Sequence, residues 1–153
     1  MSPVAPEDGI LTANDTGLAL AKQLIGRVQE HAETLSIRVS AAVVDRGGNL
    51  IVVERMDGTP LCGTPIAIDK AYSAVACAAP TDEWSTSTIP GGPDWGMASA
   101  LGGRMVVYPG GIPISLRGSI IGGLGVSGGE GDQDKACAQF ALSMSRLAED
   151  PRP

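Results

Sequence analysis

The segment Ile37–Met56 reads IRVSAAVVDRGGNLIVVERM, and it decides the fold class. Two runs rich in β-branched residues, 37–45 and 50–56, flank the polar turn Arg46-Gly47-Gly48-Asn49. This pattern is typical of an antiparallel hairpin. Three more strands are predicted downstream, at Met105–Tyr108, Ile112–Leu116 and Ser119–Val126. We therefore expect a five-stranded, mainly antiparallel sheet.

Three helices are predicted to flank this sheet. The first runs from Thr12, its expected N-cap with Asp15 in the first turn, to Leu35. The second begins at Thr64-Pro65 and ends at Pro80; its many alanines indicate that it lies very close to the sheet. The third runs from about Asp132 to Leu147. The order α-β-β-α-β-β-β-α predicts an α/β (α+β) domain.

Composition limits the class of protein. The 153 residues suffice for one domain, which we place at 12–148 between flexible tails at 1–11 and 149–153. A net charge of −6 argues against nucleic-acid or membrane-surface partners, and no apolar run approaches the length of a membrane span. The N-terminus lacks the pattern of a secretory signal, and the three cysteines suggest neither a metal site nor a disulfide framework. We therefore expect a cytoplasmic protein without a bound metal ion.

The stretch 81–103 is unusually long for a loop, which favours a functional role. It holds both tryptophans, Trp84 and Trp95, and its first residues, 81–87, are compatible with a short helix. Together with Tyr108, the two tryptophans could line an apolar pocket or pack in a subunit interface.

Six Gly-Gly pairs punctuate the chain. Three of them, at 91–92, 110–111 and 128–129, could let a ligand approach the backbone; tight turns are the alternative. The stretch 123–128 matches the glycine spacing of dinucleotide sites, and 125–129 that of a nucleophilic serine turn. We reject both, because no strand with an acidic residue and no histidine follow them. The free amides at Ser127–Gly131, before a helix, remain a possible anion site.

Four further positions carry reactive side chains. His31 is either a haem ligand or a packed helix-flank residue. Cys62, just before the second helix, is a nucleophile or soft haem ligand, or a structural thiol. Asp69-Lys70 is a surface ion pair, or Lys70 reaches over the sheet toward a ligand carboxylate. Arg104 clamps a carboxylate or pairs with a surface acid.

Six segments together resemble the GlcG/HbpS-like haem-binding family, which includes the C-terminal domain of PduO-type proteins. They are Val43–Leu50, Arg55–Leu61, Ala67–Ala74, Pro90–Pro93, Gly110–Ile114 and Gly122–Gly129. The similarity spans about residues 12–147. It implies a profilin-like or sensor-type fold, a homo-oligomer between a dimer and an octamer, and haem or another small ligand near the glycine-rich loops. The family pattern has a small residue where this chain has Cys62.

Two functional hypotheses follow. The first is a protein that binds haem or a related tetrapyrrole, with His31 or Cys62 as iron ligand. The second is a cofactor-independent enzyme, such as an isomerase, lyase, cyclase or hydrolase, acting on a small carboxylate or unsaturated carbonyl compound with Lys70, Asp69 or Cys62 as reactive group. Both use one set of predicted ligand-binding residues: Trp84, Trp95, Arg104, Tyr108, Gly110, Gly111, Pro113, Ser127, Gly128 and Gly129.

Overall fold

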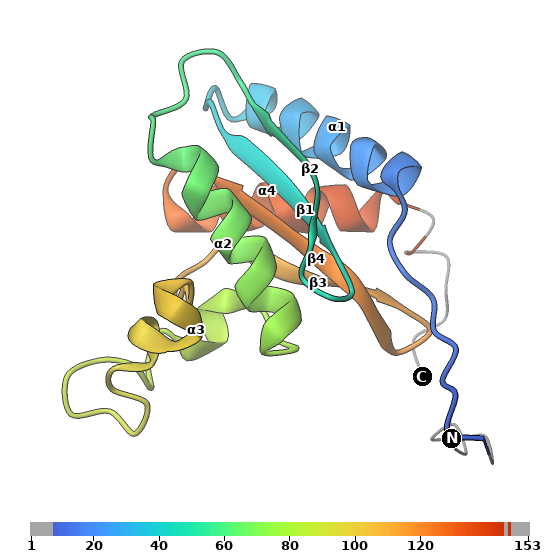
Figure 1. Cartoon of the computed structure of the whole chain (residues 1–153). Helices are drawn as coiled ribbons and strands as arrows, with labels where there is room; N and C mark the ends of the chain where they lie inside the picture. The colour runs from blue at the N-terminus through green and yellow to red at the C-terminus, as the bar shows by residue number, and fades with distance from the viewer. Residues whose placement is uncertain (1–7, 146, 148–153) are drawn as a thin grey trace.

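The computed structural model describes residues 8–145 and 147 (Figure 1). Its elements follow one another along the chain as α1 (Leu18–Thr34), β1 (Ser40–Asp45), β2 (Leu50–Arg55), α2 (Gly63–Ala76), the 3₁₀ turns η1 (Thr81–Trp84) and η2 (Met97–Ser99), α3 (Ala100–Gly103), β3 (Gly111–Leu116), β4 (Ser119–Ser127) and α4 (Gly131–Ser143). In the described part of the chain, no helix is long and apolar enough to span a membrane.

Four strands form one antiparallel sheet in the order β2-β1-β4-β3. The predicted hairpin is confirmed, with Ser40 opposite Arg55 and the turn at 46–49. The strand pair at the other edge, β3 and β4, is confirmed as well. Central strand β1 pairs with β4 from Ser40–Ser127 to Asp45–Gly122.

The predicted strand at Met105–Tyr108 is wrong, so the sheet has four strands rather than five. Side chains of neighbouring elements take up the backbone groups that a strand partner would otherwise bind. Ser73 Oγ accepts from the Val106 amide at 2.9 Å, and its single proton is shared between the carbonyls of Asp69 at 2.7 Å and Arg104 at 3.0 Å. Thr81 Oγ1 donates to the Tyr108 carbonyl at 2.6 Å. Met105 and Val106 are buried. Their apolar side chains pack in the interior although their backbone does not pair with a strand.

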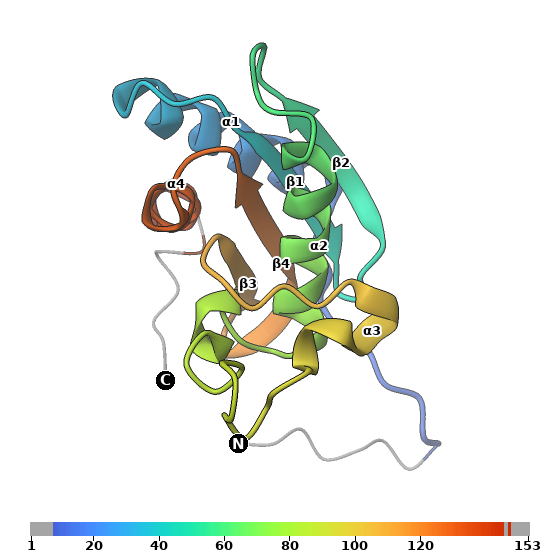
Figure 2. The same cartoon turned by 90° about the vertical axis from the view of Figure 1, so that its left-hand side faces the viewer.

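The sheet separates two helical layers (Figures 1 and 2). Helices α1 and α4 pack together on one face, and α2 covers the other. Side chains of β1 alternate between the two layers, as the pleat of a strand requires. Ala41 and Val43 join the core beneath α1 and α4, whereas Ala42 and Val44 pack with Ala67 and Ala71 of α2.

Helix α2 lies as close to the sheet as its alanines predict. A Cβ atom added to Gly125 of β4 would lie 2.0 Å from the Ala67 carbonyl oxygen, and one added to Gly123 would lie 2.2 Å from the Ala71 carbonyl oxygen. Only glycine on the strand permits this approach, because any side chain would occupy the space of the helix backbone.

The start of the first helix differs from the prediction. It begins at Leu18 with Gly17 as N-cap, and not at Thr12. Asp15 does not cap the helix: its carboxylate accepts from the Arg46 amide in the β1–β2 turn at 2.7 Å. Thr16 binds the Ile121 carbonyl of β4 through both its amide and its hydroxyl. Residues 15–16 bind these distant partners and lie outside the helix.

The other two long helices are shorter than predicted. Helix α2 runs from Gly63 to Ala76 with Cys62 as N-cap, and the Thr64 hydroxyl, the predicted cap, is bonded to the Ser40 hydroxyl at 2.9 Å. Helix α4 begins after Glu130, which forms a reciprocal capping box with Gln133, and ends at Ser143. The predicted tails lie largely outside the described residues, apart from 8–11.

Candidate functional site

The outward side of α2 brings together several predicted site residues. Cys62, Ile66, Asp69 and Tyr72 recur at helical spacing and remain at least partly exposed, whereas Ala67, Lys70 and Ala71 of the same helix are buried. We call the four exposed positions the α2 stripe. At its start, Leu61 is 85% exposed and the Cys62 thiol is exposed. An accessible thiol beside apolar surface can receive a hydrophobic ligand.

Tyr108 lies over the same end of α2. The residue is 45% exposed, and its ring centroid is 5.3 Å from Lys70 Nζ. Partial burial raises the pKa of the Tyr108 hydroxyl above its ordinary value, and the Cys62 thiol and the carboxylates of Asp134 and Asp69 raise it further. The hydroxyl therefore stays protonated and available as a hydrogen-bond donor next to the α2 stripe.

Lys70 points inward from α2 and is only 1% exposed. Its Nζ donates to the Val126 carbonyl at 2.7 Å and to Asp134 Oδ2 at 3.0 Å. Burial lowers the pKa of Lys70, while the Asp134 carboxylate opposes that shift. Of the two readings of Lys70, the structure shows an ion pair, but a buried one that ties α2 to α4. In this arrangement a substrate has no access to the amine.

The glycine loop before α4 is also satisfied from within. The Gly129 amide donates to Asp134 Oδ1 at 2.8 Å, and the Glu130 amide donates to Gln133 Oε1 at 2.9 Å. Burial raises the pKa of Asp134, and Lys70 and the amides of Gly129 and Gly128 oppose that rise. The Asp134 carboxylate thus lies where a ligand anion was expected, and Ser127 beside it is buried.

The loop Gly110-Gly111 packs directly on Lys70. A Cβ atom on Gly110, whose φ is +125°, would lie 2.6 Å from Lys70 Nζ. The Gly111 amide donates to Thr81 Oγ1 at 3.0 Å, and Pro113 lies in β3 opposite Gly123. These three predicted ligand residues therefore contact the α2–sheet interface.

Arg104 approaches the α2 stripe from the segment after α3. Its Nε donates to Asp69 Oδ1 at 2.9 Å, and its guanidinium carbon lies 3.7 Å from the centroid of the Tyr72 ring. Asp69 and Arg104 were each predicted either to form an ion pair or to act on a ligand. The structure shows that they pair with each other, and both side chains stay partly exposed.

The two tryptophans occupy different environments. Trp95 is 66% exposed, in a loop that projects away from the sheet (Figure 1). Trp84 ends the 3₁₀ turn η1, which agrees with the short helix predicted there, and its buried Nε1 has no hydrogen-bond partner among the described residues.

His31 lies in the other helical layer. Its ring stacks on Phe140 of α4, with centroids 4.7 Å apart and an interplanar angle of 17°. The two candidate iron ligands, His31 and Cys62, therefore belong to helices on opposite faces of the sheet.

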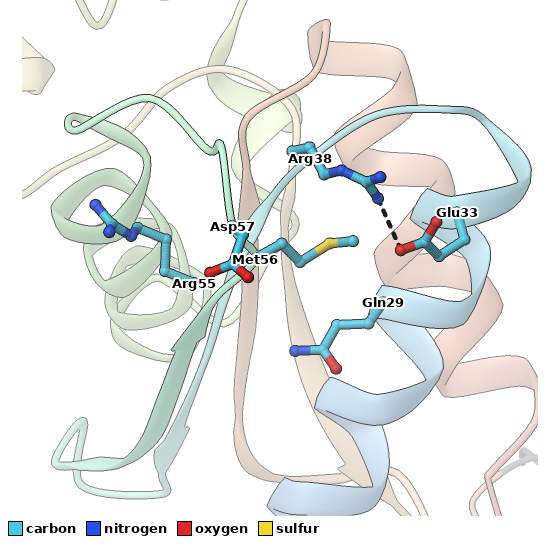
Figure 3. A pocket seen from close by; sticks show the side chains of 6 residues that line it. All are labelled: Gln29, Glu33, Arg38, Arg55, Met56 and Asp57. Carbon is cyan, nitrogen blue, oxygen red and sulfur yellow. Dashed lines mark hydrogen bonds and ion pairs between the residues drawn. The ribbon is translucent and has the colours of Figure 1, made fainter.

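An open groove lies between α1 and the end of β2, and none of its lining residues is a predicted site residue (Figure 3). Its volume is about 530 Å³, and it is lined by Gln29, Glu33, Arg38, Arg55, Met56 and Asp57. Arg38 is paired with Glu33 at 2.7 Å. Two acidic and two basic side chains line this groove, so it has no net preference for a charged ligand. Residues 8–145 and 147 contain no cluster of three or more His, Cys, Asp or Glu side chains suited to a metal ion.

Sequence reasoning missed Asp134 and Tyr72. Asp134 follows Gly129 by five residues, so local sequence could have indicated that its carboxylate accepts from the Gly129 amide. Its other partner, Lys70, is 64 residues away and could not be predicted in this way. Tyr72 follows Asp69 by three residues, which places both on one helix face. That spacing was the available signal.

Comparisons with known proteins agree with the fold. The family model described as "Haem degrading protein HbpS-like" matches residues 17–143. An uncharacterised 15.0 kDa protein from the dhaT-dhaS intergenic region of Citrobacter freundii is 36% identical over 125 residues, which are 82% of this chain and 88% of that protein. Corrinoid adenosyltransferase PduO of Salmonella typhimurium is 37% identical over 121 residues, covering 79% of this chain and 36% of PduO.

A solved structure extends these similarities. The crystal structure of a PduOC–haem complex matches with a TM-score of 0.83 and 33% identity, covering 90% of this chain and 99% of that one. Since the family model covers most of the sequence and the predicted resemblance rested on the same region, the chain belongs to the HbpS-like family.

Proposed function

We propose that this protein binds haem or a related tetrapyrrole on the α2 stripe. The observation that carries the proposal is the similarity, over 90% of the chain, to a PduOC domain solved with haem. Family membership supports haem binding in general, while the position of the site rests on the chemistry of this chain.

The residues around the start of α2 fit such a ligand. Leu61 offers apolar surface, Tyr108 offers an aromatic ring with a hydroxyl, and Cys62 offers an exposed sulfur, a donor type that binds haem iron. His31 fits less well, because its ring is already stacked on Phe140. Bound haem would supply an iron centre for redox or gas chemistry, and the protein would orient it and control its exposure to water.

The homo-oligomer implied by the resemblance stays a prediction, and so does the cytoplasmic location expected from the N-terminus and the cysteine content. So does the alternative of a cofactor-independent enzyme. Of its three reactive residues, Lys70 is buried in an ion pair, whereas Cys62 and Asp69 remain accessible.

Haemin titration followed by absorbance tests the proposal. We expect a saturable Soret band with a fixed stoichiometry per chain, and we expect Cys62→Ala to change its position or intensity. Cys77→Ala is the matched control, because Cys77 lies at the other end of α2 and is only partly exposed. Non-saturating binding would contradict haem binding and favour the enzyme alternative. A band sensitive to His31→Ala and insensitive to Cys62→Ala would move the site to the α1 side.

A further inference from the structure

The guanidinium group of Arg104 is fixed in place before any ligand binds. Its Nε is bonded to Asp69, and its central carbon lies over the Tyr72 ring, 3.7 Å from the ring centroid. Tyr72 in turn is packed against the β1–β2 turn, where a Cβ atom on Gly48 would lie 2.9 Å from the ring. An arginine held from two sides loses little side-chain entropy when it binds a further group.

The terminal nitrogens of Arg104 are left without a partner among the described residues, and the side chain is 39% exposed. Two other arginines use a terminal nitrogen for their ion pairs. Arg27 pairs with Glu30 and Arg38 pairs with Glu33, in both cases through Nη1. Arg104 binds Asp69 through Nε, which leaves both terminal nitrogens able to donate to an incoming acceptor.

Holding the backbone does not require this arrangement. Ser73 Oγ already bonds the Arg104 carbonyl and the Val106 amide, and Thr81 Oγ1 bonds the Tyr108 carbonyl. The segment 104–108 is thus tethered by hydroxyl groups at both ends. The guanidinium is therefore not needed to hold these backbone groups.

Arg104 contacts the same α2 stripe that carries the exposed Cys62 thiol. Asp69, the Arg104 partner, follows Cys62 by seven residues, which is about two helical turns or roughly 10 Å along α2. A tetrapyrrole placed near Cys62 carries carboxylate side chains at its edge, and these can span such a distance.

We propose that Arg104 is a carboxylate-binding subsite that selects tetrapyrroles with free propionate groups, an inference that rests on the proposed haem binding. Tyr72 and Asp69 act as positioning residues that aim the guanidinium. Since Asp69 already offsets part of the charge of Arg104, recognition depends on directed hydrogen bonds more than on net charge.

The test compares haemin with its dimethyl ester, in which both propionates are blocked, in the same detergent buffer. We expect wild type to bind haemin about tenfold more tightly than the ester, as one charge-assisted hydrogen bond provides. Arg104→Gln should abolish this preference without changing the Soret maximum, and Arg104→Lys should restore only part of it. Arg27→Gln is the control, because Arg27 has the same 39% exposure.

Positioning is tested at Tyr72. Tyr72→Phe keeps the ring and should keep the preference, whereas Tyr72→Leu should reduce it. Equal affinity of wild type for haemin and ester would overturn the carboxylate subsite and leave haem binding intact. A preference that survives Arg104→Gln would do the same. Failure of wild type to bind either compound would overturn both proposals together.

Discussion

Lys70 Nζ lies 3.0 Å from Asp134 Oδ2, with the two side chains only 1% and 3% exposed. This ion pair joins α2, on one face of the sheet, to α4, on the other. Every oxygen of the carboxylate has a donor, because the Gly129 amide binds Oδ1. A buried pair with all partners present is costly to break from one side only.

We therefore expect Lys70→Met and Asp134→Leu to lower the free energy of unfolding by about 3–5 kcal/mol each, because each leaves one buried charge unpaired. The double variant, which removes both charges, should be more stable than either single variant. Urea unfolding measures all three. Glu33→Ala, which breaks the exposed pair with Arg38, should cost less than about 1 kcal/mol. Additive losses in the double variant would contradict this account.

The Cys137 thiol predicts a dependence on alkaline pH. Burial, with a smaller effect of Asp134, raises its pKa from 9.0 to about 11. The folded protein therefore holds this proton more tightly than the unfolded chain. The resulting stability is fully present below pH 9 and is lost as the pH rises through 11, at up to about 1.4 kcal/mol per pH unit. Between pH 8 and 11, wild type should lose about 2–3 kcal/mol more than Cys137→Ala in urea unfolding. Parallel pH profiles would show that the thiol does not contribute.

Two glycine substitutions should have opposite effects. Gly125→Ala places a methyl group 2.0 Å from the Ala67 carbonyl oxygen, so α2 must move; we expect a loss of at least about 3 kcal/mol. Gly26→Ala lies on the exposed side of α1 with no atom within 4 Å, and it should stabilise the helix by about 0.5–1 kcal/mol. Thermal unfolding of both variants separates close packing from helix propensity. Similar Tm values for the two would refute the close approach of α2 to β4.

Thiol labelling maps the haem site without relying on mutation. Cys62 is exposed, Cys77 is partly exposed and Cys137 is buried, so labelling should proceed in that order. At haemin concentrations about ten times Kd, labelling of Cys62 should slow about tenfold, while Cys77 should react at its original rate. Mass spectrometry of the labelled peptides gives both rates in one sample. Protection of Cys77 in place of Cys62 would place the ligand at the other end of α2.

Local chemistry made much of the fold predictable. The hairpin followed from its polar turn, and the close packing of α2 followed from its alanines. Predictions failed where distant groups decide the local conformation. Asp15 and Thr16 bind the β1–β2 turn and β4, which keeps them out of α1. The strand-like run at 105–108 gives its backbone groups to Ser73 and Thr81.

The candidate site was predictable in part. The second helix was located from its sequence, with Cys62 just before it and Asp69 inside it, and the structure confirms a helix over Gly63–Ala76. The partner of Lys70 was not predictable, because Asp134 is 64 residues away and no local pattern links the two. The pairing of Arg104 with Asp69 depends on the path of the long loop, which sequence spacing does not define.

Glycines in β4 bring α2 so near the sheet that the buried residues of the helix are small, namely Gly63, Ala67, Ala71, Ser73 and Ala74, with Lys70 as the one exception. Because α2 packs this closely on the sheet, no ligand can bind between the helix and β4. Apart from Lys70, the chemically varied positions Cys62, Asp69 and Tyr72 lie on the outer side of α2, where each is at least partly exposed. Recognition can therefore diversify on that flank while the scaffold beneath it stays constant.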